Sequence, residues 1–155
     1  MKQAPDIRQV VDRMRPGVLC RDGFLGSDRR RLEEIIETDR STVAGLGTSH
    51  EAIAERLEAV YDGARAGLGT PVAIDERLTA VWREAMGRIP CPWGRCGTFP
   101  KGEVEVTDAE TGRSLLLTPL SIHQVAAHGF YQGRGSRYRV EPELACRLLR
   151  LGGQA

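Results

Sequence analysis

Two cysteines and two histidines in the second half of the chain are the residues best suited to chemistry. Cys91 and Cys96 form a C-x4-C pair within a turn-prone segment rich in proline and glycine. His123 and His128 form an H-x4-H pair further along the chain. Two thiolates and two imidazoles are a ligand set that suits tetrahedral zinc. The residue types and their spacing therefore predict a metal site of Cys91, Cys96, His123 and His128, with zinc as the metal.

The order of these residues resembles the treble-clef zinc finger. Over residues 91–128, a cysteine pair in a turn precedes a predicted β-hairpin and then a predicted helix that carries the last two ligands. The resemblance implies a structural zinc ion. The chain departs from that pattern because C-x4-C is wider than the usual C-x2-C spacing. In addition, side chains five positions apart on a helix point about 140° apart. We therefore expect both histidines to reach one ion only if the helix unwinds beside Gly129.

The same four residues have two other interpretations. Cysteine is often simply buried, His123 suits a core position, and His128 could cap the end of a helix, where the helix dipole favours an imidazolium. Alternatively, a neighbouring histidine could activate Cys91 as a nucleophile, or a metal could keep an open coordination position. Either arrangement would indicate a small hydrolase or transferase. No local sequence signature of such an enzyme surrounds the cysteines.

A second candidate site lies in the tract 130–139, which interleaves arginine, glycine and aromatic residues. Arg134, Arg137, Arg139 and Tyr138 could bind an anion or stack on the bases of single-stranded nucleic acid. The alternative is that the aromatic residues anchor a loop and the arginines are solvated. A net charge of +1 favours this alternative. Nucleic acid is therefore a possible but disfavoured partner, and a protein partner remains open.

The first half of the chain predicts helices. Apolar residues recur at helical spacing after Pro5, again over 28–44 after a Ser27 cap, and again after a capping box that begins at Thr48. The last of these helices carries Glu51, Glu55 and Glu58, which exclude it as a DNA-reading helix because the acids would face phosphates. Pro71 to Ile74 predicts a short strand. The segment 76–86 fits a helix, with a hairpin through Asp75-Glu76-Arg77 as the alternative.

The second half predicts strands first and then helices. Alternation over 103–107 and 114–118 indicates a β-hairpin, and helices are expected over 119–128 and from Pro142 to about Arg150. We therefore expect an α+β fold in which a helical N-terminal half packs on a C-terminal β-hairpin plus helices. The 155 residues suit a single domain, 1–155, with a change of organisation near residue 87.

Composition limits the compartment and the class of function. The start of the chain has no apolar segment typical of a secretory signal, and no stretch is long and apolar enough for a membrane span, so we expect a cytoplasmic protein with reduced cysteines. The segments 23–26, 91–94 and 123–133 resemble those of a group of small uncharacterised bacterial cytosolic proteins. That resemblance implies no activity. Without a catalytic signature, the sequence favours a non-enzymatic binding or adaptor protein.

Overall fold

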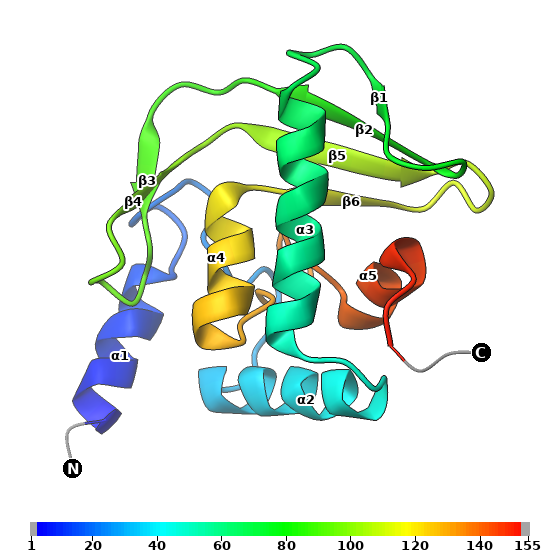
Figure 1. The fold of residues 1–155 in the computed structure, drawn as a ribbon. Helices are drawn as coiled ribbons and strands as arrows, with labels where there is room; N and C mark the ends of the chain where they lie inside the picture. Colours follow the sequence, from blue (N-terminus) through cyan, green and yellow to red (C-terminus); the bar gives the residue numbers. More distant parts are fainter. Residues whose placement is uncertain (1–2, 153–155) are drawn as a thin grey trace.

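A computed structural model describes residues 3–152 and confirms the α+β class. Its helices are α1 (Gln3–Arg13), α2 (Leu32–Gly45), α3 (His50–Arg65), α4 (Pro119–His128) and α5 (Pro142–Leu149). Its strands are β1 (Val72–Ala73), β2 (Leu78–Arg83), β3 (Arg88–Pro90), β4 (Thr98–Pro100), β5 (Glu103–Asp108) and β6 (Ser114–Leu117). Figure 1 shows α3 running across the sheet, beside α4.

The main sheet is antiparallel, with strand order β1-β2-β5-β6. Side chains alternate along β5, where Val104 and Val106 are fully buried and Glu103, Glu105 and Thr107 are only partly buried. This period of two places one face of the strand on the core. The predicted hairpin over 103–118 is confirmed, and its register pairs Val104 with Leu117 and Val106 with Leu115.

The prediction of a helix over 76–86 is wrong, and the alternative hairpin is right. This stretch forms β2, which pairs with β1 and with β5. The Asp75 carboxylate accepts hydrogen bonds from the amides of Arg77 and Leu78, both at 2.8 Å, and so fixes the turn. The apolar residues of 76–86 fit both the helical and the strand periodicity. The stretch forms a strand because the adjacent β5 offers an edge for hydrogen bonding.

Two predicted helix starts also move. The helix expected from residue 28 begins at Leu32 because the Asp28 carboxylate is engaged by Arg30 and by the amide of Arg134. Ser49, rather than Thr48, caps α3, and its hydroxyl accepts a hydrogen bond from the amide of Ala52 at 3.1 Å. Helix α4 matches the prediction at both ends: Thr118 caps it and Gly129 ends it in the left-handed conformation.

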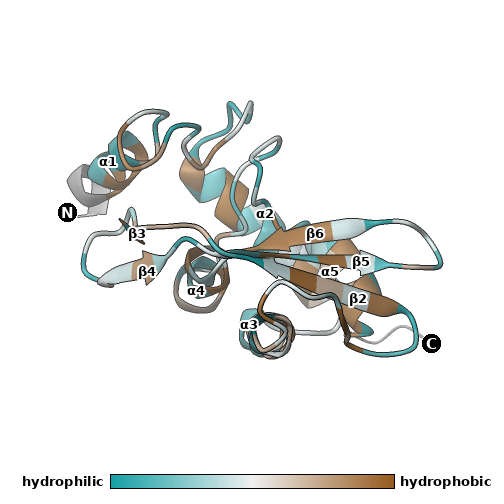
Figure 2. Cartoon of the chain, turned by 90° about the horizontal axis from the view of Figure 1, so that it is seen from above, coloured by the Kyte–Doolittle hydropathy of each residue, from teal (hydrophilic) through white to brown (hydrophobic). Residues whose placement is uncertain are grey.

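The buried apolar side chains form two separate cores. The first, which we call the sheet core, lies between β2, β5, β6 and the helices α3, α4 and α5. The second, the cysteine core, joins α1, the start of α2, the small β3–β4 hairpin and parts of α4. Figure 2 shows α1 and the β3–β4 hairpin at the opposite end of the molecule from the free end of the sheet. No helix within residues 3–152 is long and apolar enough to cross a membrane.

Candidate metal centre

The two cysteines lie in the connection between β3 and β4, a hairpin that the sequence did not predict. The strands pair through Ile89 and Phe99, so the connection returns on itself and brings Cys91 and Cys96 close together. The turn is closed by the amide of Gly94, which donates to the carbonyl of Cys91 at 2.9 Å. Gly94 has φ 98°, a left-handed conformation that glycine adopts without strain.

Helix α4 supplies both histidines. Thr118 and Ser121 form reciprocal side-chain to backbone hydrogen bonds at 3.0 Å, and Pro119 occupies the first turn. These features fix the start of the helix, since they satisfy its otherwise unpaired amides. The helix begins directly after β6, so the register of the sheet fixes where the histidines lie relative to the cysteines.

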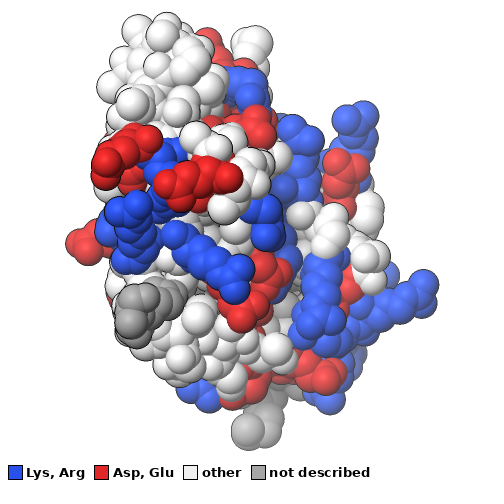
Figure 3. Space-filling model, turned by 90° about the vertical axis from the view of Figure 1, so that its right-hand side faces the viewer, with Lys and Arg blue, Asp and Glu red and all other residues white. Residues whose placement is uncertain are grey.

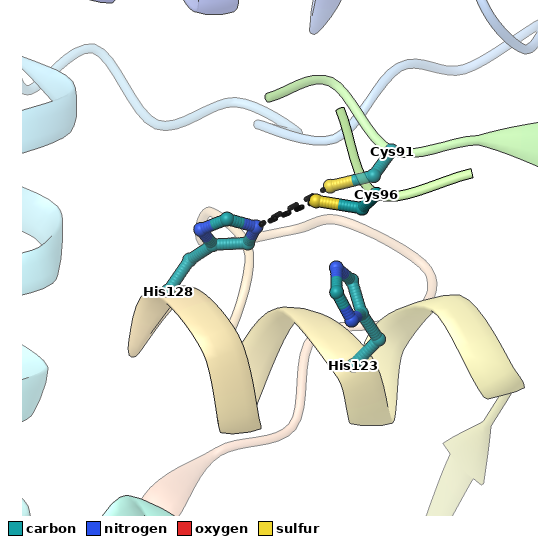
Figure 4. A group of neighbouring side chains, drawn as sticks. All are labelled: Cys91, Cys96, His123 and His128. Atoms are coloured by element: carbon teal, nitrogen blue, oxygen red, sulfur yellow. Dashed lines mark hydrogen bonds between the residues drawn. The ribbon is translucent and has the colours of Figure 1, made fainter. Parts of the chain in front are cut away.

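All four sequence-predicted residues converge on one point. One ligand atom from each of Cys91, Cys96, His123 and His128 lies within 4.8 Å of every other, so the cluster could hold a metal ion. The Nε2 atom of His128 is 3.5 Å from the Sγ atoms of both cysteines (Figure 4). Zinc bonds of about 2.3 Å to sulfur and 2.05 Å to nitrogen at a tetrahedral angle place sulfur and nitrogen about 3.6 Å apart. The observed separations fit this geometry.

The expected unwinding of α4 is not needed. The helix stays regular through His128, and the histidine rings still approach, with centroids 5.3 Å apart and planes at 83°. Figure 4 shows His123 and His128 leaning toward each other over the helix, with the cysteine turn above the space between them. The ideal angle around the axis ignores the length of the imidazole side chain, which reaches past the helix surface.

Aromatic rings hold the two imidazoles. The ring of Trp93 stacks on His128 with centroids 4.0 Å apart and planes within 6°. Phe130 packs against the edge of Trp93, and Phe99 packs on His123 at 4.6 Å. Sequence reasoning did not identify Trp93 or Phe99 as supporting residues. The only signal that could have identified them is their closeness in sequence to Cys91 and Cys96.

Burial favours the neutral forms of Cys91, His123 and His128. Burial raises the pKa of the Cys91 thiol to about 11; the amides of Trp93 and Gly94 oppose this change, and the nearby Cys96 adds to it. Burial, together with the charge of His123, lowers the pKa of His128 to about 4. Burial also lowers the pKa of His123. A metal cation would therefore displace thiol protons and bind imidazoles that are already neutral.

One potential ligand atom of the cluster is not engaged in any hydrogen bond within residues 3–152. The Nε2 atom of His123 is buried and has no hydrogen-bond partner among the described residues. A buried polar atom without a partner is costly, and such atoms commonly indicate an ion or a water. His128 does not act as the cationic helix cap considered above, because its ring faces the cysteines and its pKa is lowered.

The second candidate site is only partly available at the surface. The Arg139 guanidinium is nearly buried and pairs with the carboxylates of Asp39 and Glu141. The Tyr138 hydroxyl donates to Glu103 at 2.6 Å, whereas the side chains of Arg134 and Arg137 are exposed. Figure 3 shows basic and acidic side chains interspersed over one face of the molecule, with no field of a single sign.

A cavity of about 800 Å³ reaches the cluster from one side. His123 and Phe99 form part of its wall, and Glu51, Glu55 and Glu58 of α3 line another part. Sequence reasoning used these acids only to exclude a DNA-reading helix. Their position beside His123 depends on the packing of α3 against α4, which periodicity does not predict.

Comparison of the chain with protein-family models, with curated proteins and with solved structures found no match in any of the three. The geometry of the Cys91, Cys96, His123 and His128 cluster therefore carries the functional argument.

Proposed function

We propose that Cys91, Cys96, His123 and His128 bind a structural zinc ion, and that the protein is a binding or adaptor module rather than an enzyme. The observation that carries this proposal is the convergence of the four ligand atoms, with both sulfur–nitrogen separations to His128 at 3.5 Å. Two thiolates and two imidazoles complete a tetrahedral shell, which is typical of structural rather than catalytic zinc sites.

The bound ion would tie an element with little other support to a well-packed helix. It would connect the β3–β4 hairpin, whose strands have only three residues each, to the end of α4. Hairpins this short rarely persist alone, and a metal is a common way to stabilise them. The four cysteines are free in the structure, which favours a reducing compartment such as the cytoplasm.

Elemental analysis of protein purified without chelator tests the proposal. We expect about one zinc ion per chain, as four protein ligands imply. Cys96→Ser should lose the zinc. Cys20→Ser is the matched control because Cys20 is also half-buried and lies outside the cluster. Metal-free native protein, or equal zinc in both variants, would contradict the proposal.

The enzyme alternative keeps one supporting observation, the cavity of about 800 Å³ beside His123. Cobalt substitution separates the two functions because the absorption of Co²⁺ reports the number of its ligands. A closed site should give a tetrahedral spectrum that added azide does not change. A spectrum that shifts with azide would indicate an open coordination position and support a metal-dependent hydrolase or transferase.

A further inference from the structure

Two glycine-containing segments that the zinc site does not use meet elsewhere in the molecule. The loop 23–26 packs against the tract 130–139, and the amide of Gly133 donates to the carbonyl of Phe24 at 3.0 Å. A Cβ atom on Gly133 would lie 2.2 Å from the carbonyl oxygen of Leu25, and one on Gly26 would lie 2.4 Å from that of Arg134. Glycine at these positions is therefore required for the two backbones to touch.

These two segments form one wall of a second cavity, of about 660 Å³, which shares only Glu84, Ala85 and Pro100 with the one beside His123. Its apolar part is formed by Phe24, Ile89 and Leu120, all of them buried. The volume is that of a typical small-molecule site, in which an apolar surface is combined with a few polar groups.

A strained residue lies in the wall of this cavity. Gln132 is buried and has φ 73°, a conformation that residues other than glycine rarely adopt. Its side chain donates to Gln124 at 3.0 Å and accepts from the Ser136 hydroxyl at 2.6 Å, and these bonds hold it in place. Strained residues that their surroundings fix in this way are concentrated at ligand-binding sites.

Cations outnumber carboxylates by one among the residues that line this cavity. Four cations and three carboxylates line the cavity, and one of the carboxylates, Glu103, already accepts from Tyr138 and pairs with Arg83 and Arg137. Two of the four cations, Arg21 and Lys101, form no ion pair within residues 3–152. The other two carboxylates, Asp22 and Glu84, are exposed, as are Arg21 and Lys101, so the lining as a whole has a net charge of +1.

We propose that this cavity binds a small organic anion. A carboxylate or phosphate group would be held by Lys101 and Arg137, and an apolar body would lie against Phe24, Ile89 and Leu120. This site goes beyond the proposed zinc function, because none of the four cluster residues lines the cavity.

Amide NMR spectra of the isotopically labelled full chain, titrated with matched probes, test this proposal. Benzoate, phenyl phosphate and benzyl alcohol share one apolar ring and differ in their head group. We expect saturable shifts at residues 20–24 and 132–138 with the two anions, and about tenfold weaker binding of the neutral alcohol, because it lacks charged hydrogen bonds. The tighter of the two anions identifies the preferred head group.

Lys101→Gln and Arg137→Gln should each weaken benzoate binding about tenfold. Arg147→Gln is the control because Arg147 is exposed on α5 and does not line the cavity. The Lys101 variant breaks no ion pair, so it remains informative if the Arg137 variant loses stability. Equal binding of all three probes, an absence of saturable shifts, or unchanged binding in the Lys101 variant would overturn the proposal.

Discussion

The sheet core and the cysteine core differ in how much apolar surface each one buries. The sheet core contains more than twice as many buried side chains and lies under strands of up to six residues. In the cysteine core, half-buried residues such as Trp93 and Phe99 surround a few buried ones, and its hairpin has strands of three residues. Burial of apolar surface is the main favourable term in folding, so the cysteine core depends more on other interactions.

The candidate metal site lies in the weaker of the two cores. The cluster lies where the cysteine core meets α4, and Arg13 of α1 donates to the carbonyl of Pro92 in the same turn. A metal bound there would stabilise the weaker core from within, whereas the sheet core has no such need. Three predictions test this difference, in order of decreasing effect.

Removal of zinc should produce the largest effect, and it should be local. With a strong chelator, we expect amide hydrogens in residues 88–100 to exchange much faster, while those of β2, β5 and β6 remain protected. The reason is that the binding energy of a structural metal is also folding energy for the elements it joins. Mass-spectrometric hydrogen exchange with and without chelator measures this. Uniform loss of protection across both cores would contradict the comparison.

Leu57→Ala should weaken the sheet core without affecting metal binding. Leu57 is fully buried on α3, and removal of such a side chain lowers the free energy of unfolding by about 3 kcal/mol. Denaturant unfolding checks the stability, and elemental analysis checks that zinc content is unchanged. Met86→Ala serves as the control because Met86 is 91% exposed. Loss of zinc in the Leu57 variant would show that the two cores are not separable.

Asp28→Asn should have the smallest effect, and one that depends on pH. The hydrogen bond from Arg30 lowers the pKa of Asp28 below its ordinary value of 3.8; burial opposes this shift, and the amide of Arg134 adds to it. The folded state therefore favours the ionised form. Its contribution is fully present above the unfolded pKa and is lost as the pH falls through the folded pKa.

We expect the variant to be less stable than wild type by about 2 kcal/mol at neutral pH, as for a hydrogen bond to a charged group. The difference between the two proteins should shrink as the pH is lowered from about 5 to about 2. Denaturant unfolding of both proteins over this range measures it. A difference independent of pH would show that the Asp28 charge is not involved. Glu37→Gln is the control, because the Glu37–Arg40 pair is exposed.

The sequence alone identified the elements whose signals are local. Alternating apolar residues predicted the β5–β6 hairpin, and Pro119 together with Gly129 indicated the two ends of α4. These predictions succeed because a strand face and a helix cap are determined by neighbouring residues. The types of the four candidate ligands and their order along the chain are local information in the same sense.

Other features depended on residues far apart in the sequence. The stretch 76–86 fits both periods, and only pairing with β5 made it a strand. Arg139 lies in a basic tract but pairs with Asp39, which is 100 positions away. The β3–β4 hairpin has too few residues to give a periodic signal.

The candidate site shows the same division. Sequence supplied two thiols and two imidazoles, but its helical geometry argued against their convergence. The fold brings them together because β6 leads directly into α4 and because the β3–β4 turn lies above the histidines. Of the proposed anion-binding cavity, the sequence indicated only Arg137 and Tyr138, since its walls come from segments about 110 residues apart. The sequence determines which residue types are present, whereas long-range packing determines the distances between them.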